Sequence, residues 1–73
     1  MKKNYKCRIK TELIEEYMKE NNLNRITFCE KSKVSLDTLE KMYINNFDFD
    51  IVYLFRVCKL LNIEFKDIFE ESE

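Results

Sequence analysis

Apolar side chains in the first part of the chain recur at the spacing of an amphipathic α-helix. Between them lies a set of carboxylates that would occupy the opposite face of the same helix. The pattern predicts a helix over residues 10–21, and Asn21-Asn22 would end it, because Asn tolerates left-handed backbone better than other residues that have a β-carbon. The apolar positions of this segment are Ile9, Leu13, Ile14, Tyr17 and Met18.

Two shorter helices are predicted next, over residues 25–32 and 36–44. Asn24 precedes the first and Ser35 precedes the second, and each side chain can accept a hydrogen bond from a backbone N–H that the start of a helix leaves free. Residues 33–34 would form the short turn between the two helices. The residues expected to be buried here are Phe28, Cys29, Leu39 and Met42.

A polar and aromatic loop leads to the most apolar segment of the chain, which Asp50 opens. This segment predicts a fourth helix that ends at Asn62, and the apolar residues after it predict a short fifth helix over residues 65–71. We therefore expect an all-α, compact domain of five helices over residues 9–70. A basic N-terminal arm over residues 1–8 would precede it.

The composition narrows the possible classes of protein. Gly and Pro are both absent, which disfavours an all-β fold with many tight turns, and 73 residues suffice for a single domain. Since the chain has no His, we expect neither a zinc site nor a nucleophile with a His base, and no glycine-rich phosphate loop is present. The sequence therefore disfavours an enzyme and implies no metal and no cofactor.

The cysteines and the apolar runs indicate a cellular location. The three cysteines are odd in number and far apart, which indicates free thiols in a reducing cytoplasm. No signal peptide is expected, because no unbroken apolar stretch follows the basic start. The longest apolar run, residues 51–55, is too short to span a bilayer, so no membrane association is expected. The cysteines are Cys7, Cys29 and Cys58.

The second and third predicted helices have the features of a helix-turn-helix. A short connection separates them, and Cys29 supplies the small side chain that a close crossing of the two helices needs. Leu39 and Met42 would attach the third helix to the core, which leaves one of its surfaces free to enter a major groove. The residues expected on that surface are Ser35, Leu36, Asp37, Thr38 and Lys41.

The stretch LNRITFCEKSKVSLDTLEKMYINN resembles the phage-repressor and Cro-type (XRE-like) helix-turn-helix family, and the resemblance extends from Ile9 to Phe69. It implies a five-helix, lambda-repressor-like fold, with the helix-turn-helix in helices 2 and 3. It also implies sequence-specific binding to double-stranded DNA by a small, repressor-like transcriptional regulator that places helix 3 in the major groove. The expected DNA-contacting residues are Asn24, Arg25, Lys33, Ser35, Leu36, Asp37, Thr38, Lys41, Asn45 and Asn46.

Three departures from the family pattern change the expected chemistry. Lys33 stands where glycine is usual, so left-handed backbone there would cost roughly 1–2 kcal/mol. Arg25 replaces the Gln that commonly starts helix 2, and a guanidinium binds phosphate equally well. Leu36, Asp37 and Glu40 stand where Arg, Ser, Gln or Asn are more usual. Carboxylates repel phosphates, so the third helix is unusually acidic for a DNA reader.

The charges are unevenly distributed along the chain. Residues 1–45 contain ten Lys or Arg and seven Asp or Glu, net +3, whereas residues 46–73 contain three and seven, net −4. The overall charge of −1 and the isoelectric point near 5.5 disfavour strong nonspecific binding to nucleic acid. The alternative function is therefore a protein-interaction module, in which the acidic third helix and the acidic C-terminal half bind a basic partner.

The two functions differ in where the cations should lie. If DNA is the ligand, four cations should share the face of the third helix, namely Arg25, Lys31, Lys33 and Lys41. A homodimer is then possible, because one small module buries too little surface for selectivity and symmetric dimers match palindromic sites. The aromatic side chains of the following loop and helix are expected to close the core, with contact to a second subunit as the alternative. They are Phe47, Phe49 and Tyr53.

Overall fold

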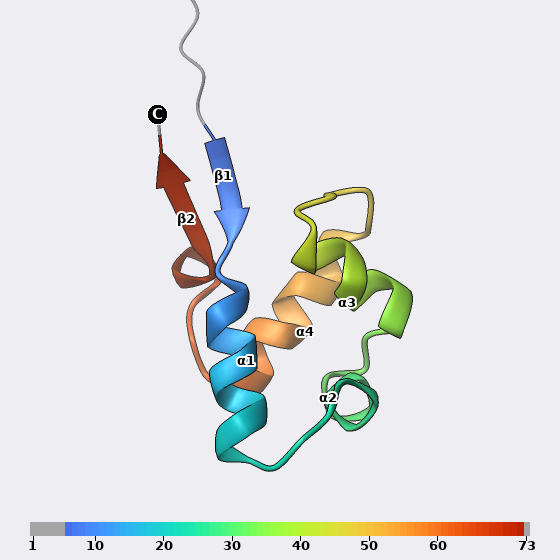
Figure 1. Cartoon of the computed structure of the whole chain (residues 1–73). Coiled ribbons are helices and arrows are strands. Elements are labelled where there is room, and N and C mark those ends of the chain that lie inside the picture. The colour runs from blue at the N-terminus through green and yellow to red at the C-terminus, as the bar shows by residue number, and fades with distance from the viewer. Residues whose placement is uncertain (1–5, 73) are drawn as a thin grey trace, which may run out of the picture.

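Four α-helices make up most of the protein in the computed structural model, which describes residues 6–72 (Figure 1). A 3-10 helix follows the fourth α-helix, and the two ends of the described chain pair as a small antiparallel sheet. In chain order the elements are β1 (Lys6–Ile9), α1 (Thr11–Glu20), α2 (Arg25–Ser32), α3 (Leu36–Tyr43), α4 (Ile51–Leu61), η1 (Phe65–Ile68) and β2 (Phe69–Ser72).

Side chains fix the starts of α2, α3 and α4. Asn24 accepts a 2.8 Å hydrogen bond from the Thr27 N–H, and the Thr27 hydroxyl accepts a 2.9 Å bond from the Asn24 N–H, which completes a capping box. Ser35 accepts from the Thr38 N–H, and Asp50 accepts from the backbone N–H two residues on. The four predicted α-helices are present, and the predicted caps at Asn24 and Ser35 are confirmed.

The predicted fifth helix over residues 65–71 is present only in part, as a 3-10 helix over residues 65–68, and residues 69–71 lie in a strand. The chain forms η1 and then β2, which pairs antiparallel with β1 so that Ile9 lies opposite Phe69 and Arg8 lies opposite Glu70. Because β1 supplies partners for the backbone N–H and C=O groups of β2, these residues do not need a helix to satisfy them. Within residues 6–72 the fold is therefore mostly helical, with four α-helices and a small sheet, and is not all-α.

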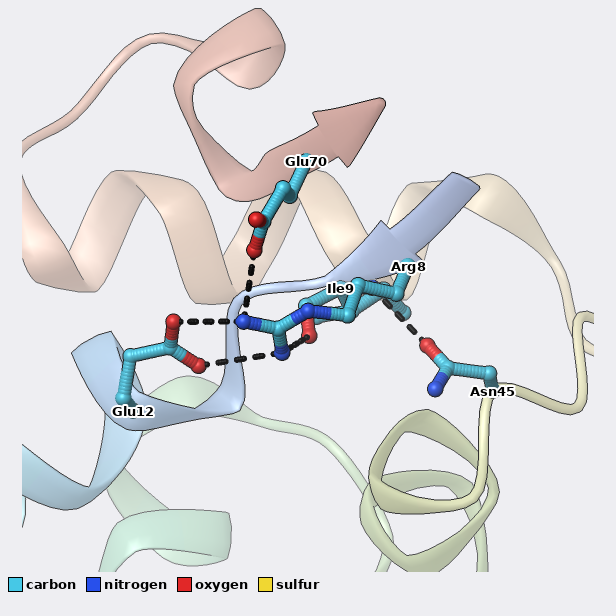
Figure 2. Close-up of polar contacts among 5 residues, drawn as sticks. All are labelled: Arg8, Ile9, Glu12, Asn45 and Glu70. Carbon is cyan, nitrogen blue, oxygen red and sulfur yellow. Dashed lines mark hydrogen bonds and ion pairs between the residues drawn. The ribbon is translucent and has the colours of Figure 1, made fainter. Parts of the chain in front are cut away.

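Part of the predicted basic arm over residues 1–8 is a strand. Residues 6–8 belong to this strand, and residues 1–5 lie outside the described residues. Figure 2 shows Arg8 between two carboxylates: its Nη2 lies 2.8 Å from Glu12 and 2.6 Å from Glu70. The hydrogen bond from Arg8 lowers the pKa of the Glu12 carboxyl below its ordinary value. Arg8 thus joins β1 to both β2 and α1.

The core collects apolar side chains from both the helices and the sheet. Two aromatic residues that were expected to close it, Phe49 and Tyr53, are partly buried and pack against it, whereas Phe47 is 47% exposed. Cys29 is also partly buried against the core. The largest fully buried side chains are Ile9, Ile14, Phe28, Leu39, Met42, Leu54, Val57 and Ile68.

Candidate nucleic-acid interface

The turn between α2 and α3 is built without glycine. Lys33 has left-handed backbone, with φ 60° and ψ 44°, and its N–H donates to the Cys29 carbonyl. Lysine at such a position costs about 1–2 kcal/mol relative to right-handed backbone. Arg56 of α4 donates a 2.7 Å hydrogen bond from Nη1 to the Lys33 carbonyl oxygen. A side chain from α4 therefore supports the strained turn that sets the angle between the two helices.

The solvent-facing side of α3 carries apolar and acidic side chains. Leu36 is 42% exposed, and Ile44, directly after the helix, is 72% exposed. Asp37 points into solvent near Lys41, with 3.7 Å between the carboxylate oxygen and Nζ. Glu40 is exposed as well. The outward positions predicted for Leu36 and Asp37 are confirmed, and the acidic character of this surface is preserved in three dimensions.

Ser35 and Thr38 hold the first turn of α3 together. The Ser35 hydroxyl donates to Thr38 Oγ1 over 2.9 Å and accepts from the Thr38 N–H over 3.2 Å. Thr38 is only 8% exposed, so the expectation that its side chain faces outward was wrong. Its hydroxyl turns toward the Ser35 hydroxyl, which satisfies it within the protein.

A hollow of about 600 Å³ lies where the start of α2 meets α3. On one side of it, the Arg25 guanidinium carbon lies 4.3 Å from the centroid of the Tyr43 ring, which is a cation–π contact. The Tyr43 hydroxyl donates to a Glu15 carboxylate oxygen on α1. Burial, followed by this hydrogen bond, raises the pKa of Tyr43 above its ordinary value, so the hydroxyl stays protonated. The residues around the hollow are Arg25, Asp37, Glu40, Lys41, Tyr43, Ile44 and Asn46.

Lys41 and Asn46 shape the loop that follows α3. Lys41 Nζ donates a 3.0 Å hydrogen bond to the Asp48 carbonyl oxygen, and the Asn46 side-chain oxygen accepts from the Asp48 N–H, also at 3.0 Å. Both side chains were expected to contact DNA, and both line the hollow beside α3. Each therefore combines a loop-forming contact with a position at the edge of the candidate interface.

Asn45 connects the end of α3 to the sheet. Its backbone is left-handed, with φ 56°, and its side-chain oxygen accepts a 2.8 Å hydrogen bond from the Ile9 N–H, as Figure 2 shows. Asn24, another residue expected at the interface, uses its side chain in the capping box of α2. Both Asn side chains therefore form hydrogen bonds with the protein's own backbone.

The structure divides the four cations that were expected to share the face of the third helix. Arg25 and Lys41 line the hollow beside α3. Lys31 and Lys33 instead line a second hollow, together with residues of α4. The two hollows have no lining residue in common. Only half of the expected cluster is therefore gathered around the solvent-facing side of α3.

Two residues of the candidate interface were missed by the sequence reasoning. Ile44 lies seven positions after Asp37 and four after Glu40, so helical spacing alone could have placed it on the same side of α3. Tyr43 had no comparable signal, because its role depends on Arg25 of a different helix and on Glu15 of a third. Contacts of this kind are fixed by the packing of helices, not by local spacing.

Two short helices, a three-residue connection and a capped, solvent-facing third helix define a helix-turn-helix domain. A comparison with protein families matches residues 14–71 to the family described as the Cro/C1-type helix-turn-helix DNA-binding domain. The chain belongs to this family, which confirms the resemblance found in the sequence. The match begins within α1, so β1 precedes the matched residues. Searches of curated proteins and of solved structures returned no significant match.

None of the helices within residues 6–72 has the length and apolar character needed to cross a membrane. In the same range, no three Cys, Asp or Glu side chains come close enough together to hold a metal ion.

Proposed function

We propose that the protein binds double-stranded DNA sequence-specifically as a small, repressor-like transcriptional regulator, with α3 in the major groove. Membership of a DNA-binding family supports this function. The observation that carries it is the position of Arg25, which lies over Tyr43 at the edge of the solvent-facing side of α3. A fixed guanidinium beside a free helix surface is suited to binding a phosphate at the edge of a groove.

The residues of α3 suggest how bases would be read. Leu36 and Ile44 are exposed and apolar, which suits contact with the methyl group of thymine. Asp37 and Glu40 can accept a hydrogen bond from the amino group of cytosine, and they repel phosphates when no such donor faces them. Acidic residues on α3 would therefore reduce affinity for most sequences and preserve it for a few. Regulation would follow from occupying a promoter.

Several of the other expected contact residues keep a place in this proposal. Lys41 and Asn46 line the same hollow as Arg25, so they are candidates for phosphate or sugar contacts. Ser35, Asn24 and Asn45 have side chains engaged within the protein, and they would act by positioning helix starts and the loop. Thr38 is buried, and we leave it out of the proposed interface.

The experiment is selection of bound sequences from a random DNA pool, followed by titration of the selected duplex at several salt concentrations. Arg25→Ala should weaken binding to selected and random duplexes alike, and it should reduce the salt slope by about one, the value for one lost phosphate contact. Lys66→Ala is the matched control, because Lys66 is an exposed cation on η1 that lies away from α2 and α3. Equal salt slopes for the two variants would contradict the proposed binding surface.

A protein-interaction module is the second candidate function. One observation favours it: the hollow beside α3 contains two carboxylates, Asp37 and Glu40, for its two cations, Arg25 and Lys41. A surface without a net positive charge is a poor phosphate binder and can accept a basic peptide. This candidate predicts no detectable binding of the wild-type protein to any duplex at low salt.

We further propose that the DNA-binding form is a homodimer. Apolar side chains are exposed at the start of α4, among them Ile51, Val52 and Phe55, and the Phe55 ring stacks on Phe65 with 4.4 Å between centroids. This surface follows directly on the loop after α3, so a two-fold partner there would bring a second α3 to the same DNA. Sedimentation equilibrium tests the proposal: Phe55→Glu should shift the protein to monomer, whereas a wild-type monomer at all concentrations would contradict it.

We also propose that the protein is cytoplasmic. Cys7, Cys29 and Cys58 are all free thiols. A reducing compartment keeps thiols in this state, whereas small secreted domains usually pair their cysteines. Expression of a tagged full chain followed by cell fractionation tests the assignment, and recovery from the culture medium would contradict it.

A further inference from the structure

A second hollow, of about 470 Å³, lies between the C-terminal ends of α2 and α4. It is lined by four cations and by no carboxylate, although the protein as a whole has a net charge of −1. Arg56 and Lys59 are two of the three cations in the acidic half of the chain, and both face this hollow. The lining residues are Lys31, Ser32, Lys33, Arg56, Lys59 and Leu60.

These four positive charges are not neutralised by nearby carboxylates. Among residues 7–71, the cations found in ion pairs are Arg8, Lys41 and Lys66, and none of them lines this hollow. The cations that do line it are all exposed to solvent. Two helix C-termini attract positive charge, but each presents only about half a negative unit charge. Four full charges exceed that amount, so the hollow has a surplus of positive charge.

Part of the hollow is held in a fixed geometry. Arg56 donates a 2.7 Å hydrogen bond to the Lys33 carbonyl oxygen, and its guanidinium carbon lies 5.3 Å from the centroid of the Tyr53 ring. A guanidinium has five N–H donors, and this contact uses one Nη1 donor. The remaining donors are available to a ligand. Because Arg56 is already held in place, ligand binding would cost little side-chain entropy at this residue.

We propose that this hollow is a binding site for a phosphate-bearing anion, separate from the surface of α3. A phosphate group has several acceptor oxygens and more negative charge than a carboxylate, which suits one guanidinium and three ammonium groups around a concave surface. The apolar side chain of Leu60 and the aliphatic parts of the lysines offer room for the organic part of a phosphate ester. The proposal goes beyond DNA reading by α3 and does not require it.

The test is an amide-resolved NMR titration of the full chain with inorganic pyrophosphate at low salt. We expect saturable shifts at the backbone amides of the hollow. The double variant Lys33→Gln/Lys59→Gln should weaken binding about tenfold, because it removes two charge-assisted contacts. The matched control is Lys19→Gln/Lys66→Gln, which removes the same charge from exposed positions elsewhere and should bind pyrophosphate like the wild type. Shifts that never saturate, or equal weakening by both double variants, would overturn the proposal.

A second titration, with a short random duplex, identifies the source of the phosphate. If the duplex shifts the same amides and the Lys33→Gln/Lys59→Gln variant loses about two units of salt slope, the site holds the DNA backbone. If pyrophosphate binds while that variant leaves duplex affinity unchanged, the ligand is a free phosphate-bearing molecule. Both results support the site. Failure of Arg25→Ala to affect DNA binding would count against reading by α3 and would leave the pyrophosphate result intact.

Discussion

The side-chain oxygen of Asn45 lies 2.8 Å from the backbone nitrogen of Ile9, whose N–H it accepts as a hydrogen bond. This contact joins the residue after the helix-turn-helix to the first strand of the sheet. Ile9 is fully buried, so its N–H has little access to water if the partner is lost. The placement of the loop after α3 therefore depends on one carboxamide.

We expect Asn45→Gly to lower the free energy of unfolding by about 1–3 kcal/mol, the usual cost of leaving a buried donor without a partner. Gly readily adopts the left-handed backbone of Asn45, and its backbone effects should be shared by a second left-handed Asn, so the difference between the two variants reports the hydrogen bond. Urea unfolding measures the effect. Asn62→Gly is the control, because Asn62 has the same backbone form and no side-chain hydrogen bond within residues 6–72. Equal stability of the two variants would refute the role of the Asn45 side chain.

The lysine in the turn between α2 and α3 gives a prediction of opposite sign. Lys33→Gly should raise the free energy of unfolding by roughly 0.5–1 kcal/mol. Removing the left-handed strain stabilises the folded state by more than the extra conformational entropy of Gly stabilises the unfolded chain. Lys31→Gly, two residues earlier within α2, should lower it by about 1 kcal/mol. Chemical denaturation of both variants checks the difference. Destabilisation by both would mean that the Lys33 side chain contributes more than its backbone costs.

Substitution of Asp37 tests the proposal that the acidic α3 reads DNA. Its carboxylate is exposed and only loosely paired with Lys41. Asp37→Asn should tighten binding to random duplex by removing phosphate repulsion, while discrimination at one base pair of the selected site falls by about 1–3 kcal/mol. Titration of fluorescent duplexes at two salt concentrations measures both effects. If neither protein binds any duplex at low salt, the DNA hypothesis fails and the protein-interaction candidate replaces it.

Cys58 gives a prediction about pH. Burial raises the pKa of its thiol from 9.0 to about 11, so the folded protein keeps the neutral thiol at pH values where the unfolded chain ionises. The stability that this difference provides is complete below about pH 9 and is lost as the pH rises toward about 11. Stability of Cys58→Ala should therefore fall less steeply than that of the wild type between these two pH values. Parallel pH dependences in urea unfolding would contradict the burial of the thiol.

Local signals predicted the helical part of the fold well. The spacing of apolar residues located four helices, and the capping residues Asn24 and Ser35 located the starts of α2 and α3. Asn62 was expected to end the fourth helix, and it adopts left-handed backbone there. Each of these features depends on residues within about one turn of a helix, so neighbouring positions in the sequence contain the information.

Long-range contacts explain what the sequence did not reveal. The segment Phe69–Ser72 forms a strand because β1, at the other end of the described chain, pairs with it, and no local pattern indicated that pairing. The contact between Arg25 and Tyr43 and the division of the cations between two hollows also depend on how helices pack. The outward face of α3 was predictable except at Thr38, whose side chain is buried.

The pairing of β1 with β2 also has a consequence for the order of folding. It brings together residues as far apart in sequence as Lys6 and Ser72, so almost the whole chain forms the loop that this pairing closes. Closing a long loop costs conformational entropy before the strand contacts can stabilise the protein. The turn between α2 and α3 is short, so their contact has a much smaller entropic cost. We therefore expect the helix-turn-helix to assemble early and the sheet to close last, so that the ends of the chain join a scaffold that is already formed.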